Sequence, residues 1–181
     1  LKLDVEESIV NCIVMGLLNV YFMFDKNVSS NEKEIFYEKS IEWYNKALDN
    51  KTGFVEHAIG NKYYEGNGVS RNKEIAFEWY KKGMEKGDVD SFNYVGDYYE
   101  KELKCNEKAL EVYLKGVEKN NYECMVRASM IYREFGDKEK SLLFLKKAAK
   151  NGYGRAMYLL GYRYLNGSTV TKVYNKAIKW C

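Results

Sequence analysis

The chain has no proline and only one histidine among its 181 residues. Proline marks turns in many sandwiches, barrels and helical repeats, so the turns here must depend on glycine, asparagine and aspartate. The single histidine, His57, has no cysteine near it in the sequence, which argues against a catalytic pair and against a zinc site. We therefore expect no metal, no cofactor and no enzymatic activity.

The cysteines also lack the spacing of a metal site. Cys105 and Cys124 lie 19 residues apart. An intervening helix would hold them roughly 20 Å apart, beyond the about 7 Å that a disulfide spans. Cys12 and Cys181 form no C-x-x-C motif either. Free thiols in a reducing compartment are the expectation, and they favour a cytoplasmic protein, although a leader removed upstream of the first residue is an alternative.

Long runs of one residue class are missing as well. No run of lysine and arginine is long enough to follow a phosphate backbone, and the net charge is +3, so nucleic acid is not an expected partner. The most apolar stretch, residues 8–24, is shorter than the roughly 20 residues of a membrane span. Acidic residues precede it, whereas a secretory signal begins with positive charge. We predict a buried first helix and no membrane span.

The chain does contain a repeated tract, whose copies recur at intervals of 32–36 residues. This period is typical of an array of supersecondary units, which presents an extended surface rather than a chemical pocket. The copies are IEWYNKALDNKTG (41–53), FEWYKKGMEKGD (77–88), LEVYLKGVEKNN (110–121) and LLFLKKAAKNGY (142–153), aligned on Trp43, Trp79, Val112 and Phe144.

A second pattern precedes most copies, with a small residue three positions before a tyrosine. Apolar residues at spacings of four and three share one helix face, and the small residue lets a neighbouring helix approach closely. The sequence predicts an all-α solenoid of about five antiparallel hairpins, each with a helix A and a helix B. We interpret residues 1–181 as one domain with units at approximately 5–50, 53–87, 88–120, 121–152 and 153–181. The expected core pairs are Gly60 and Tyr63, Gly96 and Tyr99, Ser129 and Tyr132, and Gly161 and Tyr164.

Short polar residues and glycines predict the ends of the B helices. Ser29 and Glu32 have the spacing of a capping box. Asn106 and Asp137 stand where an N-cap is expected. Glycines at positions 87 and 152 stand just beyond the ends of two B helices, where glycine is favoured.

Residues 54–88 resemble the Sel-one-like repeat (SLR), a close relative of the tetratricopeptide repeat (TPR). The resemblance implies a right-handed solenoid whose A helices line a concave groove. It also implies a non-enzymatic adaptor or scaffold that binds a protein or peptide. Units three and four lack the Gly-x-Gly-Val loop and have nearly tetratricopeptide spacing. The matching residues are Tyr64-Glu65-Gly66-Asn67-Gly68-Val69, Glu78-Trp79-Tyr80-Lys81-Lys82 and Gly87.

The resemblance further implies which A-helix residues face the groove. The middle of the groove is acidic, with Asp90, Asp97 and Glu100, and its C-terminal end is aromatic. We expect a basic segment with apolar anchors as the ligand; an ordinary solvated face is the alternative. The same positions include Val126. The predicted partner-binding residues are Phe54, His57, Asn61, Tyr64, Asn93, Asp97, Glu100, Met130, Arg133, Arg155, Tyr158 and Tyr162.

The groove positions of the first unit are apolar and include Val10, Ile13 and Leu17. An exposed patch of this kind needs cover. We expect residues 25–30 of the chain itself to supply the cover, and self-association or a partner protein is the alternative.

The expected function is therefore that of a protein–protein interaction module. An inhibitor or immunity-type protein that caps one effector is the alternative. A hydrolase with the repeats as scaffold is the least supported hypothesis, because the sequence contains no catalytic constellation. His57 is expected on the groove surface rather than as a general base, and Gly66-x-Gly68 is expected as a turn rather than a phosphate loop.

Overall fold

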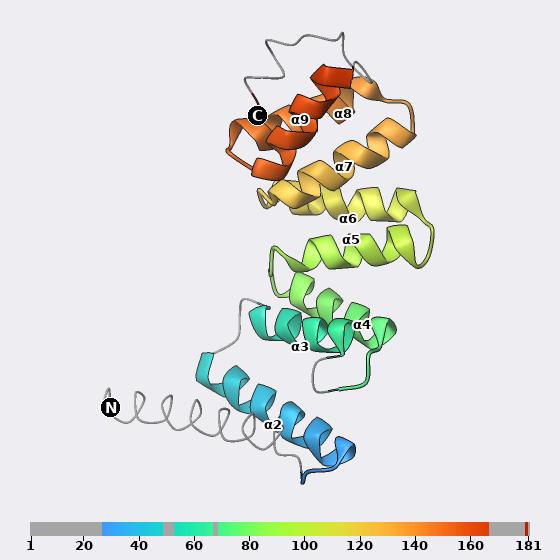
Figure 1. Ribbon diagram of the computed structural model, residues 1–181. Helices are drawn as coiled ribbons and strands as arrows, with labels where there is room; N and C mark the ends of the chain where they lie inside the picture. The colour runs from blue at the N-terminus through green and yellow to red at the C-terminus, as the bar shows by residue number, and fades with distance from the viewer. Residues whose placement is uncertain (1–26, 49–52, 67–68, 167–179, 181) are drawn as a thin grey trace, which may run out of the picture. The chain divides into compact units, whose positions relative to one another are not determined.

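The computed structural model describes residues 27–48, 53–66, 69–166 and 180, and over these residues it contains eight helices and no strand (Figure 1). The all-α prediction is therefore confirmed. The predictions for Cys12, Cys181 and the apolar set Val10, Ile13 and Leu17 lie outside the described residues.

The chain divides into two compact units, Leu1–Ser91 and Phe92–Cys181. In each, consecutive helices form hairpins, which confirms the solenoid of helical hairpins; α3/α4, α5/α6 and α7/α8 are the predicted A/B pairs (Figure 1). The interpretation as one domain of five units stays a prediction. The helices are α2 (Ser30–Leu48), α3 (Phe54–Glu65), α4 (Lys73–Glu85), α5 (Ser91–Lys101), α6 (Asn106–Glu118), α7 (Tyr122–Glu134), α8 (Lys138–Lys150) and α9 (Gly154–Asn166).

In the hairpins α3/α4 and α5/α6, a tyrosine of helix B lies directly over the glycine of helix A. A Cβ atom added to Gly60 would lie 2.6 Å from the ring of Tyr80, and one added to Gly96 would lie 2.3 Å from the ring of Tyr113. Both tyrosines are buried. Because any side chain at these glycines would meet the ring, the predicted close approach of the two helices is confirmed.

Of the four tyrosines predicted to be core, two are buried and two are not. Tyr63 and Tyr164 are buried, as expected. Tyr99 and Tyr132 are partly exposed, so the prediction is wrong for them. Tyr132 stacks on Phe144 with 5.5 Å between ring centroids, and this contact places it at the edge of the core rather than inside it.

Most of the predicted helix ends are confirmed. Glu32 Oε2 accepts a hydrogen bond from the Ser29 backbone N–H at 3.0 Å, as a capping box requires. Asp137 caps α8. Gly87 and Gly152 follow α4 and α8 with φ angles of 96° and 80°, a left-handed conformation that glycine adopts without strain.

The predicted cap at Asn106 is wrong. Asn106 is the first residue of α6, the cap position belongs to Cys105, and the Asn106 side chain donates instead to Glu134 Oε2 at 3.0 Å. Two asparagines outside the predicted caps, Asn72 and Asn121, cap α4 and α7 with their side-chain oxygens. Asparagine is among the preferred N-cap residues, so composition alone contained the signal for both.

Candidate functional site

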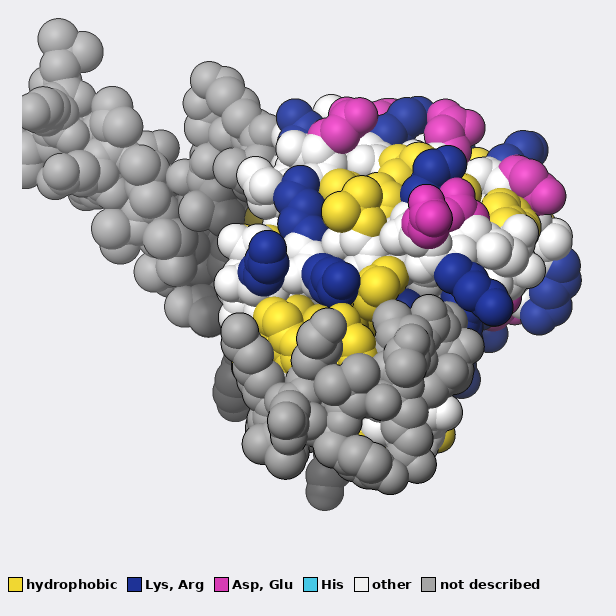
Figure 2. Space-filling model, turned by 90° about the horizontal axis from the view of Figure 1, so that it is seen from above, with side chains coloured by type: hydrophobic (Ala, Val, Ile, Leu, Met, Phe, Trp, Pro, Cys, Tyr) yellow, Lys and Arg dark blue, Asp and Glu magenta, His cyan; other side chains and the backbone are white. Residues whose placement is uncertain are grey.

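Three exposed apolar side chains share one face of α9, the last A helix in the described part of the chain. Tyr158 is 65% exposed, Tyr162 52% and Leu165 38%, and their spacing of four and three residues places them in one row. The two tyrosine rings stack with 6.4 Å between their centroids. Figure 2, which views the molecule from the end where α8 and α9 lie in Figure 1, shows hydrophobic side chains among charged ones.

Tyr158 occupies a helix position that is covered in α5 and α7, the earlier A helices of the compact unit Phe92–Cys181. In α5 the equivalent residue is Asn93, whose Oδ1 accepts a hydrogen bond from Cys124 Sγ of α7 at 2.9 Å. In α7 it is Val126, which is completely buried, so the prediction of Val126 as a groove residue is wrong. No A helix follows α9 among the described residues, and Tyr158 is exposed.

Glu123 of α7 connects three side chains next to this face. Its Oε1 accepts a hydrogen bond from Arg127 Nε at 2.9 Å and another from the guanidinium of Arg155. Its Oε2 accepts from the hydroxyl of Tyr153 at 2.7 Å. Burial, together with this hydrogen bond to Glu123, raises the pKa of Tyr153 to about 12. The predicted site residue Arg155 is thus held by a carboxylate of the preceding A helix.

Asp97 of α5 forms a second group of polar contacts. It accepts a hydrogen bond from the hydroxyl of Tyr113 at 2.7 Å, and it pairs with Lys101 at 2.5 Å and with Arg127 Nη2 at 3.3 Å. Glu100 accepts from the same tyrosine hydroxyl at 2.9 Å. Burial and these two carboxylates raise the pKa of Tyr113 far above its usual range.

Asp97, one of the three acids in the predicted acidic middle of the groove, is therefore paired with cations of the chain itself. Arg127 reaches both Asp97 and Glu123, and burial, which opposes its charge, is outweighed by these carboxylates, so the pKa of Arg127 is raised. Arg127 is absent from the predicted groove set. Glu123 and Arg127 are spaced as an i, i+4 ion pair on a helix, and that spacing was the signal available in the sequence.

Arg163 of α9 lies buried against the hairpin α7/α8. Its Nη1 donates to Ser141 Oγ at 3.0 Å and its Nη2 to Ser129 Oγ at 3.1 Å. Burial, with a smaller contribution from Arg133, lowers the pKa of Arg163 to about 10. This arginine holds three helices together. The predicted groove residue Arg133 is exposed, whereas Met130 is half-buried.

In the compact unit Leu1–Ser91, two of the predicted groove residues lie on the surface. Phe54 and Tyr64 are exposed, and Arg71 lies against Tyr64, with its guanidinium carbon 5.9 Å from the ring centroid. Asn61 instead accepts a hydrogen bond from the hydroxyl of Tyr80 at 2.7 Å. Asn61 thereby holds the hairpin α3/α4 together.

His57 belongs to a helix cap. Its side chain is only 13% exposed. The prediction that His57 lies on the groove surface is therefore wrong, because most of the ring is buried. Its Nδ1 lies 2.9 Å from Asp88 Oδ2 and 3.3 Å from Ser91 Oγ. A serine–histidine–aspartate relay uses both ring nitrogens, whereas these two contacts share one. Asp88 Oδ2 also accepts from the Ser91 backbone N–H at 2.7 Å, which caps the start of α5.

The charge of Asp88 depends on this cluster. Burial alone would raise the pKa of its carboxyl, but the hydrogen bonds from His57 and Ser91 lower it below its ordinary value. A hydrogen bond that favours the charged form has this effect.

Within the described ranges, no group of three or more histidine, cysteine, aspartate or glutamate side chains could hold a metal ion. Cys105 and Cys124 are free thiols, as the sequence predicts. Across the same residues, every helix is too short or too polar to cross a bilayer.

The hairpins and their glycine–tyrosine seams define a solenoid of the kind built from short helical repeats. The Sel1 repeat matches residues 37–51, 56–88, 131–153 and 154–181. These stretches make up more than half of the chain, so the chain belongs to the Sel1 repeat family, which confirms the resemblance. The unmatched residues 89–130 hold α5, α6 and most of α7. Sel1 repeats are scaffolds for protein–protein interaction.

Solved structures share this fold. A Sel1 repeat protein from Oxalobacter formigenes is 27% identical, with a TM-score of 0.67, over 80% of this chain and 61% of that protein. A protective antigen from uropathogenic Escherichia coli with an SLR fold is 19% identical, with a TM-score of 0.67, over 95% and 44%. An immunity protein from Pseudomonas aeruginosa is 19% identical, with a TM-score of 0.58, over 94% and 63%. The chain spans less than two thirds of each.

Proposed function

We propose that the chain binds a segment of a partner protein on the A-helix surface of the compact unit Phe92–Cys181. The observation that carries this proposal is the exposed face of α9, on which Tyr158, Tyr162 and Leu165 lie together. Exposed apolar clusters rimmed by polar groups mark interaction sites, and tyrosines are enriched among the residues that dominate binding energy. The two tyrosines are the anchors of this site.

A row of paired charges next to the anchors orients the partner. Arg155, Glu123, Arg127 and Asp97 contact one another in series and alternate in sign. Their side chains are already held by one another, so less conformational entropy is lost when a partner binds them. The expected ligand is a segment with apolar anchors flanked by groups of both charges, rather than a purely basic one.

A second candidate function is the capping of one specific effector. A surface of interlocked charges cannot repack to suit many partners, which favours specificity for one. The fold shared with an immunity protein is compatible with this candidate. A single tight one-to-one complex would distinguish it from an adaptor with several clients.

The test uses a partner captured from the native source and then purified. Calorimetry with the Tyr158→Ala/Tyr162→Ala variant should show binding weakened by about 30-fold or more, because truncation of anchor residues costs at least about 2 kcal/mol in total. Leu143→Ala is the matched control, since Leu143 is exposed on α8 and not on the α9 face. Unchanged binding by the tyrosine variant, with its helical spectrum intact, would contradict the proposal.

A further inference from the structure

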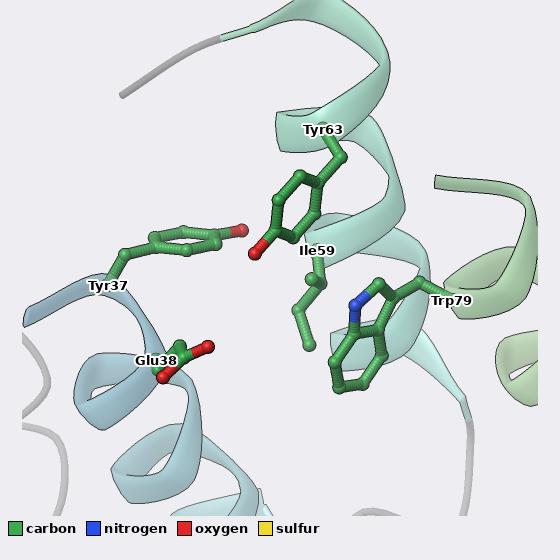
Figure 3. A pocket seen from close by; sticks show the side chains of 5 residues that line it. All are labelled: Tyr37, Glu38, Ile59, Tyr63 and Trp79. Carbon is green, nitrogen blue, oxygen red and sulfur yellow. The ribbon is translucent and has the colours of Figure 1, made fainter. Parts of the chain in front are cut away.

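A pocket of about 270 Å³ lies among three helices of the compact unit Leu1–Ser91 (Figure 3). Tyr37 and Glu38 line it from α2, Ile59 and Tyr63 from α3, and Trp79 from α4. Three of its five side chains are aromatic and one is a carboxylate. None of them belongs to the predicted groove set or to the α9 face, so this aromatic pocket is a separate feature of the molecule.

We propose that the aromatic pocket receives the ammonium group of a lysine side chain from a partner protein. The faces of tyrosine and tryptophan rings attract cations, most strongly where water is excluded. In Figure 3 the hydroxyl groups of Tyr37 and Tyr63 point toward one another at the border of the space, and the carboxylate of Glu38 points into it from α2. A cation placed there lies near two tyrosine hydroxyl oxygens and a negative charge.

Glu38 is suited to be the counter-charge. It is exposed, and it forms no hydrogen bond or ion pair with any other residue in the described part of the chain. Many other carboxylates here are already paired, as Glu56 is with Lys86 at 2.5 Å. A lysine ammonium has three N–H donors, and the carboxylate and the two tyrosine hydroxyl oxygens are groups that can accept them.

The volume of the pocket and the cation–π contact that Trp79 already makes both support a single lysine side chain as the occupant. Pockets for drug-sized ligands occupy roughly 300–1,000 Å³, so about 270 Å³ fits one lysine side chain, with its methylene groups against Ile59. Trp79 already attracts one ammonium group, because Lys82 Nζ lies 4.3 Å from the centroid of its ring. Lys82 is not among the residues that line the pocket.

This inference rests on the proposed function in one respect, because it takes the lysine from a partner protein. The two sites are nevertheless on different helices. Substitutions at one leave the side chains of the other untouched, so each site can be tested without the other.

The test is a titration of the intact chain with Nα-acetyl-lysine methylamide, followed by the indole N–H signal of Trp79 in a ¹⁵N–¹H spectrum. The matched neutral probe is Nα-acetyl-norleucine methylamide. The lysine probe should shift the signal in a saturable way at millimolar concentrations, and the norleucine probe should not. Trp79→Phe assigns the signal. Glu38→Gln should weaken the lysine probe about fivefold, the upper range for an exposed ion pair, and Glu42→Gln, on the same helix but outside the pocket, should not.

Two results would overturn the inference. One is equal binding of the two probes, which would mean that the pocket recognises apolar surface alone. The other is a lysine titration that is absent, or that is unchanged by Glu38→Gln. If Tyr158→Ala/Tyr162→Ala abolishes partner binding while the lysine probe never enters the pocket, only this inference fails. If the lysine probe binds but the tyrosine variant retains its partner, only the proposed function fails.

Discussion

In the hairpin α3/α4, Tyr80 lies over Gly60 and its hydroxyl donates to Asn61. In the hairpin α7/α8, Leu145 occupies the position equivalent to Tyr80, and Met130 occupies the position equivalent to Asn61. The hairpin α5/α6 follows the first arrangement, with Tyr113 over a glycine and Asp97 as acceptor. The donor and the acceptor of this seam are thus present together or absent together.

The small residues of the two arrangements differ as well. In α7/α8 both are serines, Ser129 and Ser141, and Ser141 Oγ donates to the Ser129 carbonyl oxygen at 2.6 Å. The two hydroxyl oxygens also accept hydrogen bonds from the guanidinium of Arg163 in α9. A tyrosine seam satisfies its polar groups within two helices, whereas the serine seam needs a third. One repeat pattern can thus stabilise a hairpin alone or tie it to the next helix.

The largest effect is expected where the tyrosine seam is closest. Gly96→Ala places a Cβ atom 2.3 Å from the ring of Tyr113, and overpacking of this kind costs about 3 kcal/mol. Gly154→Ala is the control, because nothing lies within 4 Å of the added atom; it should change the free energy of unfolding by less than about 0.5 kcal/mol. Denaturant titration measures both. Equal changes for Gly96→Ala and Gly154→Ala would show that the Tyr113 ring moves aside at little cost.

The next effect concerns the serine seam. Arg163→Met removes the guanidinium and leaves two buried hydroxyls with fewer partners, at a cost of about 2 kcal/mol. Adding Ser129→Ala and Ser141→Ala to this variant should recover part of the loss, because no orphaned hydroxyl is then left. A double-mutant cycle by denaturation measures the coupling. Strictly additive losses would mean that the arginine and the serines act independently.

Removal of the tyrosine hydroxyls should have smaller effects. Tyr113→Phe breaks hydrogen bonds to two carboxylates, Asp97 and Glu100, and should cost about 1.5 kcal/mol, because bonds to charged groups are the stronger ones. Tyr80→Phe breaks a bond to the neutral Asn61 and should cost about 1 kcal/mol. Denaturation of both variants checks the order, and a larger loss for Tyr80→Phe would reverse it.

The smallest expected effect is a difference between two helix caps in how their contribution to the free energy of unfolding depends on pH. Asp88, at the start of α5, has a lowered pKa, whereas Asn121, which caps α7, does not titrate. A carboxyl with a lowered folded pKa stabilises the fold above its unfolded pKa of about 3.9, and this contribution is lost as the pH falls through the folded value. Asp88→Asn should therefore cost less than about 1 kcal/mol at pH 7 and almost nothing at acid pH. A constant difference between pH 7 and pH 3 would contradict the assignment.

Helix positions could be predicted because they depend on local pattern. The period, the small residues and the caps at Ser29 and Asp137 all agree with the structure. The cap at Asn106 could not be distinguished from its neighbours, because the choice between adjacent residues depends on Glu134 of another helix, which binds the Asn106 side chain.

The candidate site could be predicted only in part. The exposure of Tyr158 and Tyr162 agrees with their assignment as surface anchors. Val126, His57 and Tyr158 have equivalent positions in their own helices, yet the first two are fully or mostly buried and Tyr158 is 65% exposed. Burial at this position depends on what the next A helix brings to it, and sequence spacing within one helix does not contain that information.

By itself, the sequence determined an all-helical array of hairpins, because small and aromatic residues at helical spacing can be buried only by a packed neighbour. The tertiary structure decided which charges are paired and which side chains surround a common space. Arg127 bridges two carboxylates from different helices, and the aromatic pocket collects residues from three. Electrostatic balance and pocket shape depend on distances between helices, which vary with every contact along the chain and leave no periodic signal.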